Sequence, residues 1–438
     1  MIVSRTENKP IEEARRQWGA QPEVWTERMM TALTGGVKEG KWHSLIDKVY
    51  SPKTLKRAWK SVRKNRGAAG IDRQSVKQFA KDAEQHLAKL QRELRNGDYT
   101  PQAVLRCWID KPGTTEKRPL GIPAVRDRIV QTALHLVIGP IFEASFARHS
   151  YGFRPGRGCK DALREVSRLL MAGSIWVVDL DLKSYFDTIL HEMLMNYVSE
   201  FIADGKVLEL IRAYLKAGVL DGETLDPAET GTPQGAVISP LMANLYLNAL
   251  DHQMETRGYS MIRYADDLVV LCRTQEEAAG ALKEIATYAE GHGLTVHPTK
   301  TRLVDASVKG GFDFLGYHFE RGYKWPKKKA IQRLRDTLRS KTKRTNGKSL
   351  TVIINKVNKT LKGWFEYFQH SHKSTFRELD GWLRDRIRSI LRKRQKRRGR
   401  ARSGDRVKWP NAYFTTHGLF SLTVAHRLIC HSLVRATH

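Results

Sequence analysis

Residues 261–271 read MIRYADDLVVL, a short apolar run, two adjacent aspartates and a second apolar run. This pattern predicts a strand, a tight turn and a strand, with Asp266 and Asp267 at the tip of the hairpin. Two carboxylates between buried strands repel each other, and such a pair is costly unless cations neutralise it. A divalent metal ion is the simplest remedy, although an aspartate pair in an exposed turn would give the same pattern.

A second run of strand length with acidic residues lies upstream, at residues 175–182 (IWVVDLDL). If Asp181 lies beside Asp266 and Asp267, the three carboxylates can hold two Mg²⁺ ions, with Mn²⁺ as a substitute. Two such ions support attack of a 3′-hydroxyl on the α-phosphate of a nucleotide. No nucleophilic side chain is needed, because positioning and charge neutralisation supply most of the rate.

The charge of the chain points to a nucleic acid as partner. The 438 residues include 76 Lys and Arg against 46 Asp and Glu, a formal net charge of +30. Residues 321–438 hold 32 of these basic residues and 6 of the acidic ones, so nearly all the excess lies in the last quarter. We therefore expect a boundary near Arg321, followed by a segment that binds phosphates.

Apolar residues recur at helical spacing within this basic segment, from Phe376 through Leu383 to Ile390. One face of such a helix can pack while another meets a phosphate backbone. A disordered basic tail is the alternative. The residues that we expect to contact RNA are Arg384, Arg388, Arg392, Lys393 and Arg394.

The chain has four widely spaced cysteines, which argues against a disulfide scaffold or a zinc clamp. No stretch approaches the roughly 18 apolar residues of a membrane-spanning helix. We therefore expect a cytoplasmic protein in a reducing compartment, with no membrane partner.

Several blocks in chain order resemble those of the group II intron-encoded reverse transcriptase/maturase family. They are RPLGIP (118–123), SYGFRPG (150–156), DLKSYFD (181–187), TPQG (232–235), YADD (264–267) and FLG (314–316). The run GWFEYF (363–368) is similar to the maturase, or thumb, signature of that family. The resemblance covers roughly residues 45–425, and an ordered set of blocks is far more specific than any single motif.

The resemblance implies an α+β right-hand polymerase with fingers, a palm with an antiparallel sheet, a helical thumb and a basic C-terminal extension. The expected divisions are an N-terminal extension (1–50), fingers (51–175), a palm with the catalytic site (176–320), a basic helical thumb that binds RNA (321–404) and a short DNA-binding segment (405–438). Many family members also carry a C-terminal endonuclease with cysteine pairs, and this chain is expected to lack one.

The resemblance also implies roles for individual residues. The catalytic metal ligands would be Asp181, Asp266 and Asp267, with the backbone carbonyl of Leu182 as a further ligand. Phe186 would lie against the nucleotide sugar and exclude a 2′-hydroxyl, which selects deoxynucleotides. The remaining contacts to the nucleotide would come from Lys111 and Arg118 on the triphosphate, from Gln234 in the TPQG loop, and from Lys300 as proton donor to the leaving pyrophosphate.

The function implied is that of an RNA-directed DNA polymerase encoded by a group II intron. Its partners would be the intron RNA, an RNA template with a DNA primer or target DNA, and dNTPs. It would promote splicing and copy the intron into DNA during intron mobility. Two alternatives stay open: a domesticated or defence-type reverse transcriptase with the same palm, and an RNA-binding splicing factor whose palm is only a scaffold.

Overall fold

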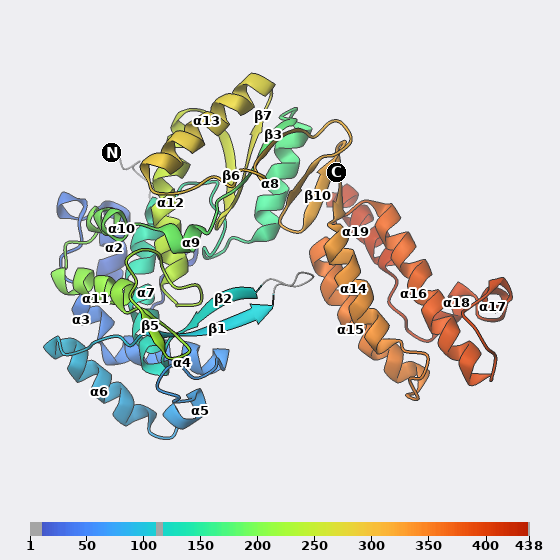
Figure 1. The fold of residues 1–438 in the computed structure, drawn as a ribbon, viewed down its shortest axis with the longest axis horizontal. Coiled ribbons are helices and arrows are strands. Elements are labelled where there is room, and N and C mark those ends of the chain that lie inside the picture. Colours follow the sequence, from blue (N-terminus) through green and yellow to red (C-terminus); the bar gives the residue numbers. More distant parts are fainter. Residues whose placement is uncertain (1–10, 111–116, 437–438) are drawn as a thin grey trace. The chain divides into compact units, whose positions relative to one another are not determined.

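The computed structural model describes residues 11–110 and 117–436 (Figure 1). The chain divides into two compact units, the first ending at Leu303 and the second beginning at Val304. Each unit has its own cluster of buried apolar side chains. No helix within the described ranges combines the length and the apolar character needed to cross a membrane.

The first unit begins with short helices that pack around a shared core. Pro52 starts α4, where the fixed φ of proline favours a helix start, and Arg66 ends it in the left-handed region with φ 50°. A capping box of Ser75 and Gln78 starts a short helix, and the chain leaves helical geometry at Asp82 before the next helix begins. These helices are α1 (Ile11–Trp18), α2 (Glu27–Gly35), α3 (Ile46–Val49), α4 (Pro52–Asn65), α5 (Val76–Phe79) and α6 (Ala83–Asn96).

A four-stranded sheet with the order β2-β1-β4-β5 follows. The antiparallel pair β1–β2 places Arg118 opposite Ile109, and β4 runs parallel to β1. Lys111, expected to contact the triphosphate, lies outside the described residues. The strands are β1 (Val104–Asp110), β2 (Lys117–Ile122), β4 (Val219–Asp221) and β5 (Thr224–Asp226).

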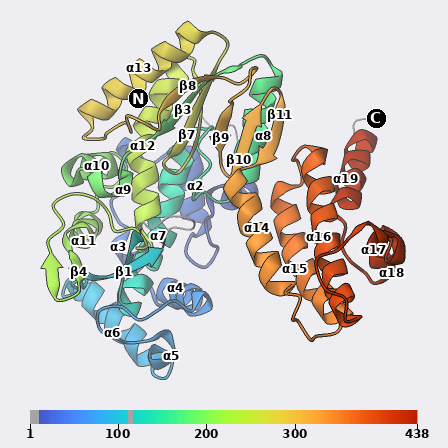
Figure 2. The ribbon, with the colours of Figure 1, turned by 45° about the vertical axis from the view of Figure 1, so that its right-hand side comes forward.

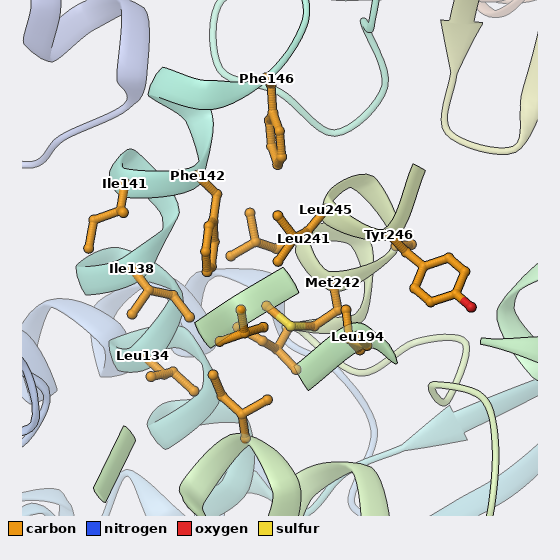
Figure 3. Packing of buried hydrophobic residues seen from close by; sticks show 14 of the residues in the cluster. Leu134, Ile138, Ile141, Phe142, Phe146, Leu194, Leu241, Met242, Leu245 and Tyr246 are labelled. Carbon is orange, nitrogen blue, oxygen red and sulfur yellow. The ribbon is translucent and has the colours of Figure 1, made fainter. Parts of the chain in front are cut away.

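The core of the first unit is built on two buried helices, α7 (Val125–Ser145) and α12 (Ser239–Thr256). Figure 3 shows the face of α7 that carries Leu134, Ile138 and Phe142 next to Leu241 and Met242 of α12. Both helices carry buried residues around most of their circumference, which is typical of helices at the centre of a large domain. The other helices of this unit are α8 (Cys159–Met171), α9 (Tyr185–Thr188), α10 (His191–Ser199), α11 (Gly205–Lys216) and α13 (Gln275–Gly291).

A second four-stranded sheet has the order β6-β7-β3-β8 and carries the acidic residues identified from the sequence. The predicted strand–turn–strand is confirmed, because β6 and β7 pair antiparallel and are joined by Ala265 and Asp266. Helices α8, α12 and α13 pack on this sheet. The strands are β3 (Trp176–Asp181), β6 (Ser260–Tyr264), β7 (Asp267–Cys272) and β8 (Arg302–Asp305).

The second unit contains a small antiparallel sheet and a helical bundle (Figure 2). The predicted amphipathic helix is confirmed, because Phe376, Leu383 and Ile390 are all buried on α16, which continues to Arg394. That outcome contradicts a disordered tail over this stretch. The elements are β9 (Phe312–Phe314), β10 (Tyr317–Glu320), β11 (Tyr323–Pro326), α14 (Lys328–Lys341), α15 (Leu350–Phe368), α16 (Lys373–Arg394), α17 (Ser403–Lys408), α18 (Asn411–Thr416) and α19 (Leu422–Ala436).

The division between the units falls before the position near Arg321 at which the charge changes. Two hydrogen bonds explain why the small sheet belongs to the second unit. The Tyr317 hydroxyl donates to the carbonyl of Tyr367 on α15 at 2.7 Å, and the Tyr367 hydroxyl donates to the carbonyl of Leu315 at 2.7 Å. The strands are thus fixed to the bundle, although their composition is not basic.

Candidate active site

The turn between β6 and β7 brings two of the predicted carboxylates to one end of the sheet. Ala265 has φ 59°, in the left-handed region, and Asp266 follows it at the tip. Asp267 begins β7 directly opposite Asp181, the last residue of β3. Opposed residues of an antiparallel pair have Cα atoms about 4.5–5.5 Å apart and side chains on the same face. Asp181, which is distant in the sequence from the other two aspartates, therefore lies at the same sheet end as Asp266 and Asp267.

The surroundings of Asp266 make a negative charge on its carboxyl group unfavourable. Burial raises the pKa of Asp266, and the charge of Asp181 adds to that increase, whereas Arg118 opposes it. A divalent cation would stabilise the charged carboxylates, and carboxylate oxygens are the ligands that Mg²⁺ prefers. Within the described ranges, no three acidic, histidine or cysteine side chains are gathered closely enough in this structure to hold a metal ion.

Lys300 lies against the first of these aspartates. Its Nζ donates to the Asp181 carboxylate at 2.7 Å. The segment that carries Lys300 is held beside β3 by two backbone bonds, from Lys183 N to the Thr295 carbonyl and from His297 N to the Asp181 carbonyl, both at 2.8 Å. These two bonds form the bridge between Leu182 and Val296 without using the Leu182 carbonyl, the predicted additional metal ligand.

Two of the predicted nucleotide contacts are joined to each other. Arg118 Nε donates to Gln234 Oε1 at 2.9 Å, and Gly121 N donates to the Gln234 carbonyl at 2.6 Å. The TPQG loop therefore rests on strand β2. A glycine is required at position 235, because φ is 111° there and a Cβ would lie 2.6 Å from the Gly121 carbonyl oxygen.

A cavity of about 320 Å³ lies beside this contact. Arg106, Asp187 and Gln234 are among the residues that line it. Arg106 and Arg118 both lower the pKa of Asp187, against the larger raising effect of burial. The charges of two arginines on the β1–β2 pair therefore act on α9, the short helix that follows Asp181.

The ring of Phe186 belongs to the core of the first unit. It is 7% exposed and lies edge-on to Tyr185, with ring centroids 5.4 Å apart. The Phe186 carbonyl accepts a hydrogen bond from Thr232 N at 2.7 Å, so the residue is also tied to the TPQG loop. Its role in excluding a 2′-hydroxyl stays a prediction.

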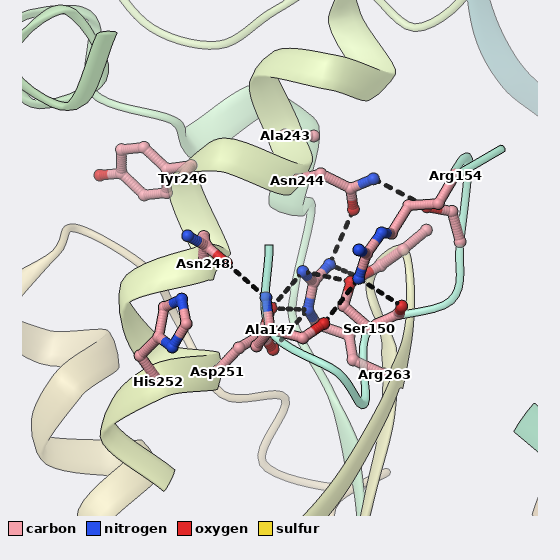
Figure 4. Close-up of polar contacts among 12 residues, drawn as sticks. Ala147, Ser150, Arg154, Ala243, Asn244, Tyr246, Asn248, Asp251, His252 and Arg263 are labelled. Carbon is pink, nitrogen blue, oxygen red and sulfur yellow. Dashed lines mark hydrogen bonds and ion pairs between the residues drawn. The ribbon is translucent and has the colours of Figure 1, made fainter. Parts of the chain in front are cut away.

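Arg263 was not identified from the sequence, and it lies in a buried polar network with Asn244, Asp251 and Ser150 (Figure 4). This side chain is 1% exposed. Its guanidinium donates to the Ala265 carbonyl in the turn and to Asn244 Oδ1, both at 2.9 Å, and to Ser150 Oγ at 2.8 Å. Its charge is balanced by Asp251 on α12, whose carboxylate accepts from Nε at 2.8 Å.

The SYGFRPG block approaches the same turn through a glycine. A Cβ on Gly152 would lie 2.3 Å from the amide nitrogen of Ala265, so no other residue fits at position 152 without displacing the turn. Asn244 Nδ2 donates to the Gly152 carbonyl at 2.7 Å and fixes this approach. The block therefore supports the geometry of the aspartates.

The structure corrects the expectation that Arg388 contacts RNA. Arg388 is 3% exposed and donates to the Trp409 carbonyl and to Asn411 Oδ1, both at 2.9 Å, besides its ion pair with Asp385. These bonds hold the segment after α17 against α16. That segment covers the face of α16 on which Arg388 lies, so the side chain is not available to RNA.

The other four basic residues expected at the RNA surface differ in their contacts. Arg384 pairs with Asp380 at 3.5 Å, and Arg392 pairs with Asp405 at 3.1 Å. Lys393 and Arg394 are exposed. Arg394 also donates to the Lys348 carbonyl. The RNA-facing role of all four stays a prediction.

Comparison with known proteins identifies two family models in the chain. Residues 109–319 match the model described as reverse transcriptase (RNA-dependent DNA polymerase), and residues 331–409 match the group II intron, maturase-specific domain. The first match contains all three aspartates and the TPQG loop. The second lies wholly within the second unit.

Several individual proteins are also similar to this chain. The chain is 32% identical over 354 residues to Protein YkfC of Escherichia coli K12, a match that covers 72% of this chain and 91% of the relative. It is 38% identical over 196 residues to the group II intron-encoded protein LtrA of Lactococcus lactis, covering 44% of this chain and 32% of LtrA. Among solved structures, telomerase from Candida albicans in complex with a fragment of telomeric RNA matches with TM-score 0.42 and 12% identity, over 73% of this chain and 66% of that one. The chain belongs to the group II intron-encoded reverse transcriptase/maturase family.

Proposed function

We propose that this protein copies group II intron RNA into DNA by two-metal nucleotidyl transfer and also binds that RNA to promote its splicing. The observation that carries the polymerase part is the register of β3 and β7, which sets Asp181 directly opposite Asp267, next to Asp266 at the tip of the turn. A purely structural turn would have no use for three acidic residues at one sheet end.

Asp181, Asp266 and Asp267 would hold the metal ions after the Asp181 side chain turns from Lys300 toward Asp267. When bound, two divalent ions lower the pKa of the attacking 3′-hydroxyl and neutralise charge on the leaving pyrophosphate. The residues fit this role because their donor atoms are carboxylate oxygens and because burial already disfavours the uncompensated charge of Asp266.

The other residues of the site would bind and orient the nucleotide. Arg118 would contact the triphosphate, and its bond to Gln234 would keep the guanidinium in position. Lys300, once separated from Asp181, would donate its proton to the pyrophosphate oxygen that leaves. Phe186 would close the space next to C2′ and so select dNTPs over ribonucleotides.

The splicing part of the proposal rests on the second unit. Its maturase-specific match and its strong positive charge both favour binding of a structured RNA. The template would be the same intron RNA, and a DNA primer or target DNA would supply the 3′-hydroxyl. Mg²⁺ is the ion that we expect, with Mn²⁺ as a substitute.

Replacement of Asp266 by Asn tests the polymerase assignment. We expect the rate of DNA synthesis on a primed RNA template to fall by at least about 10³-fold, because a metal ligand is lost from a site that acts by charge stabilisation. RNA affinity should stay within about twofold, since the basic residues that we expect to bind RNA lie in the second unit. The measurements are primer extension with labelled primer and fluorescence anisotropy with labelled RNA.

Asp98→Asn is the matched control, because Asp98 is exposed in the same unit and the substitution removes the same charge. This control should keep its rate of synthesis. Undiminished synthesis by Asp266→Asn would refute the metal assignment. A wild-type protein that binds and splices intron RNA but extends no primer would favour the splicing factor with a scaffold palm.

A further inference from the structure

Three arginines surround one tryptophan in the second unit. The guanidinium carbons of Arg335, Arg339 and Arg386 lie 5.7, 5.8 and 5.4 Å from the centroid of the Trp382 ring. The first two arginines are on α14, one helical turn apart, and the third follows Trp382 by one turn on α16. The two helices therefore present a single cluster of cations around a half-buried indole.

Cation–π attraction does not account for all three arginines. An indole attracts cations at its two faces, whereas its edge carries partial positive charge. With three guanidinium groups at nearly equal distances, at least two of them share a face or one of them lies toward the edge. The cluster therefore contains close like charges that the ring alone does not compensate.

Among the described residues, only one acidic side chain pairs with the cluster, and that pair is exposed. The Arg335 guanidinium has no hydrogen-bond or ion-pair partner in the described part of the chain, and its Nε is buried. Arg386 donates to neutral oxygens, namely Thr342 Oγ1 at 2.8 Å and the carbonyls of Thr342 and Arg339 at 3.1 and 3.4 Å. The one ion pair, from Arg339 to Asp336 at 2.5 Å, is exposed and therefore weak.

The electrostatic consequence is visible at Arg386. Burial lowers the pKa of this guanidinium, and the charges of Arg339 and Arg400 lower it further. Exposed Arg400 thus lies within electrostatic reach of the cluster and extends it. Bringing an anion to this place would relieve repulsion that the free protein carries.

We propose that Arg335, Arg339 and Arg386, arranged around Trp382, form a binding site for a phosphodiester group of RNA. Guanidinium groups bind phosphate oxygens through paired N–H donors, and a stacked guanidinium is already oriented, so little freedom is lost on binding. RNA is the polyanion of choice because all four residues lie within the maturase-specific match at 331–409. The inference rests on the proposed function and locates its RNA contact on residues other than the five expected from the sequence.

The test compares two double variants of the full-length protein. Arg335→Gln with Arg339→Gln removes two charges of the cluster. Lys329→Gln with Arg333→Gln is the matched control, because these residues are exposed on the same helix, have the same spacing and carry the same charge. Binding of a fluorescein-labelled RNA hairpin, and of a DNA duplex of the same sequence, is measured across a series of salt concentrations.

We expect the cluster variant to lose at least about tenfold in RNA affinity and to reduce the slope of log affinity against log salt by about one to two, because phosphate contacts are lost. The control should lose less than about threefold, with a slope close to that of the wild type. Arg339→Gln alone is the fallback if the double variant does not fold, since this side chain is 44% exposed. It should reduce the slope by about one.

Equal losses of RNA affinity in the cluster and control variants would overturn the site, because RNA binding would then depend on the total charge of the helix and not on these arginines. A loss confined to the DNA duplex would overturn the assignment to RNA. A wild-type protein that binds neither RNA nor DNA would refute the proposed splicing function together with the site. If the wild-type protein binds RNA and the cluster variants bind it equally well, the proposed site is refuted, but the proposed splicing function is not.

Discussion

Arg263 contacts three parts of the first unit at once: α12 through Asp251 and Asn244, the loop before α8 through Ser150, and the aspartate turn through the Ala265 carbonyl. A buried arginine of this kind costs free energy to desolvate and is tolerated because each N–H finds an acceptor. Its contact with Ala265 places a fixed donor beneath the residue that precedes Asp266. Arg263 therefore helps to fix the position of the turn, together with the close approach of Gly152.

Replacement of Arg263 by Met leaves Asp251 buried without a counter-charge, and we expect a loss of about 3–5 kcal/mol in the free energy of unfolding. A second substitution, Asp251→Leu, removes the stranded charge and should restore much of that stability. The rate of DNA synthesis at saturating dNTP should stay low in the double variant, because the turn has still lost its donor. Chemical denaturation and primer extension measure the two effects, and a rate that recovers with stability would show that Arg263 acts on stability alone.

The sequence indicated the three aspartates because strand patterns and ordered motifs identify them without tertiary information. Arg263 was missed because a charged residue inside the run MIRY reads as an ordinary strand position, although its isolation among apolar neighbours was an available signal. The opposite error occurred at Arg388. Periodicity along α16 shows the face that packs on its neighbouring helices, and it cannot show that the segment around Trp409 covers a second face.

At the scale of elements, Asp405 connects the end of α16 to the start of α17. Its carboxylate accepts from Arg402 N at 2.8 Å and forms an ion pair with Arg392. The hydrogen bond from Arg402, followed by the charge of Arg392, lowers the pKa of Asp405. A carboxyl group whose pKa is lower in the folded state stabilises the fold while it is ionised.

Replacement of Asp405 by Asn should therefore destabilise the protein at neutral pH and much less in acid. The stabilisation by Asp405 is fully present above the pKa of an unfolded aspartate, about 3.9, and is lost as the pH falls through the lower folded value. Urea denaturation of the wild type and the variant at neutral pH and at successively lower pH gives the comparison. A difference in unfolding free energy that stays constant across this range would contradict the assignment.

Element types were more predictable than element ends. The hairpin at residues 261–271 and the helix through Phe376 follow directly from apolar spacing. The break between α5 and α6 does not, because the run of residues 75–96 keeps helix-forming composition throughout, whereas the backbone leaves helical geometry at Asp82 (φ −123°, ψ 35°). Local backbone geometry of this kind overrides a propensity that is weak at each residue.

At the scale of the whole molecule, the described residues form two separate apolar clusters, one within each unit. We predict that the units unfold in separate steps, since each has a core of its own. Differential scanning calorimetry should then show two overlapping transitions, with a calorimetric enthalpy above the van't Hoff value. A single transition with equal enthalpies would contradict this expectation.

Charge and packing divide the chain at different places, which limited what the sequence could predict. The charge changes near Arg321, whereas the packing changes at Leu303, because the strands between them carry acidic residues such as Asp313 and Glu320 and yet join the basic bundle. Composition records the net charge of a segment, but its placement depends on contacts such as that of Tyr317 with Tyr367. The finer division into five parts stays a prediction.

The close approach of Gly152 to Ala265 has a consequence for the history of the family. With the Cβ position only 2.3 Å from a backbone nitrogen, any side chain at residue 152 would push the aspartate tip out of place. A compensating change would have to arise in the turn itself, where Ala265 already has an unusual backbone angle. Among descendants that still synthesise DNA, these two positions should therefore vary together or not vary at all, whereas lineages that have abandoned polymerisation should accumulate changes at both.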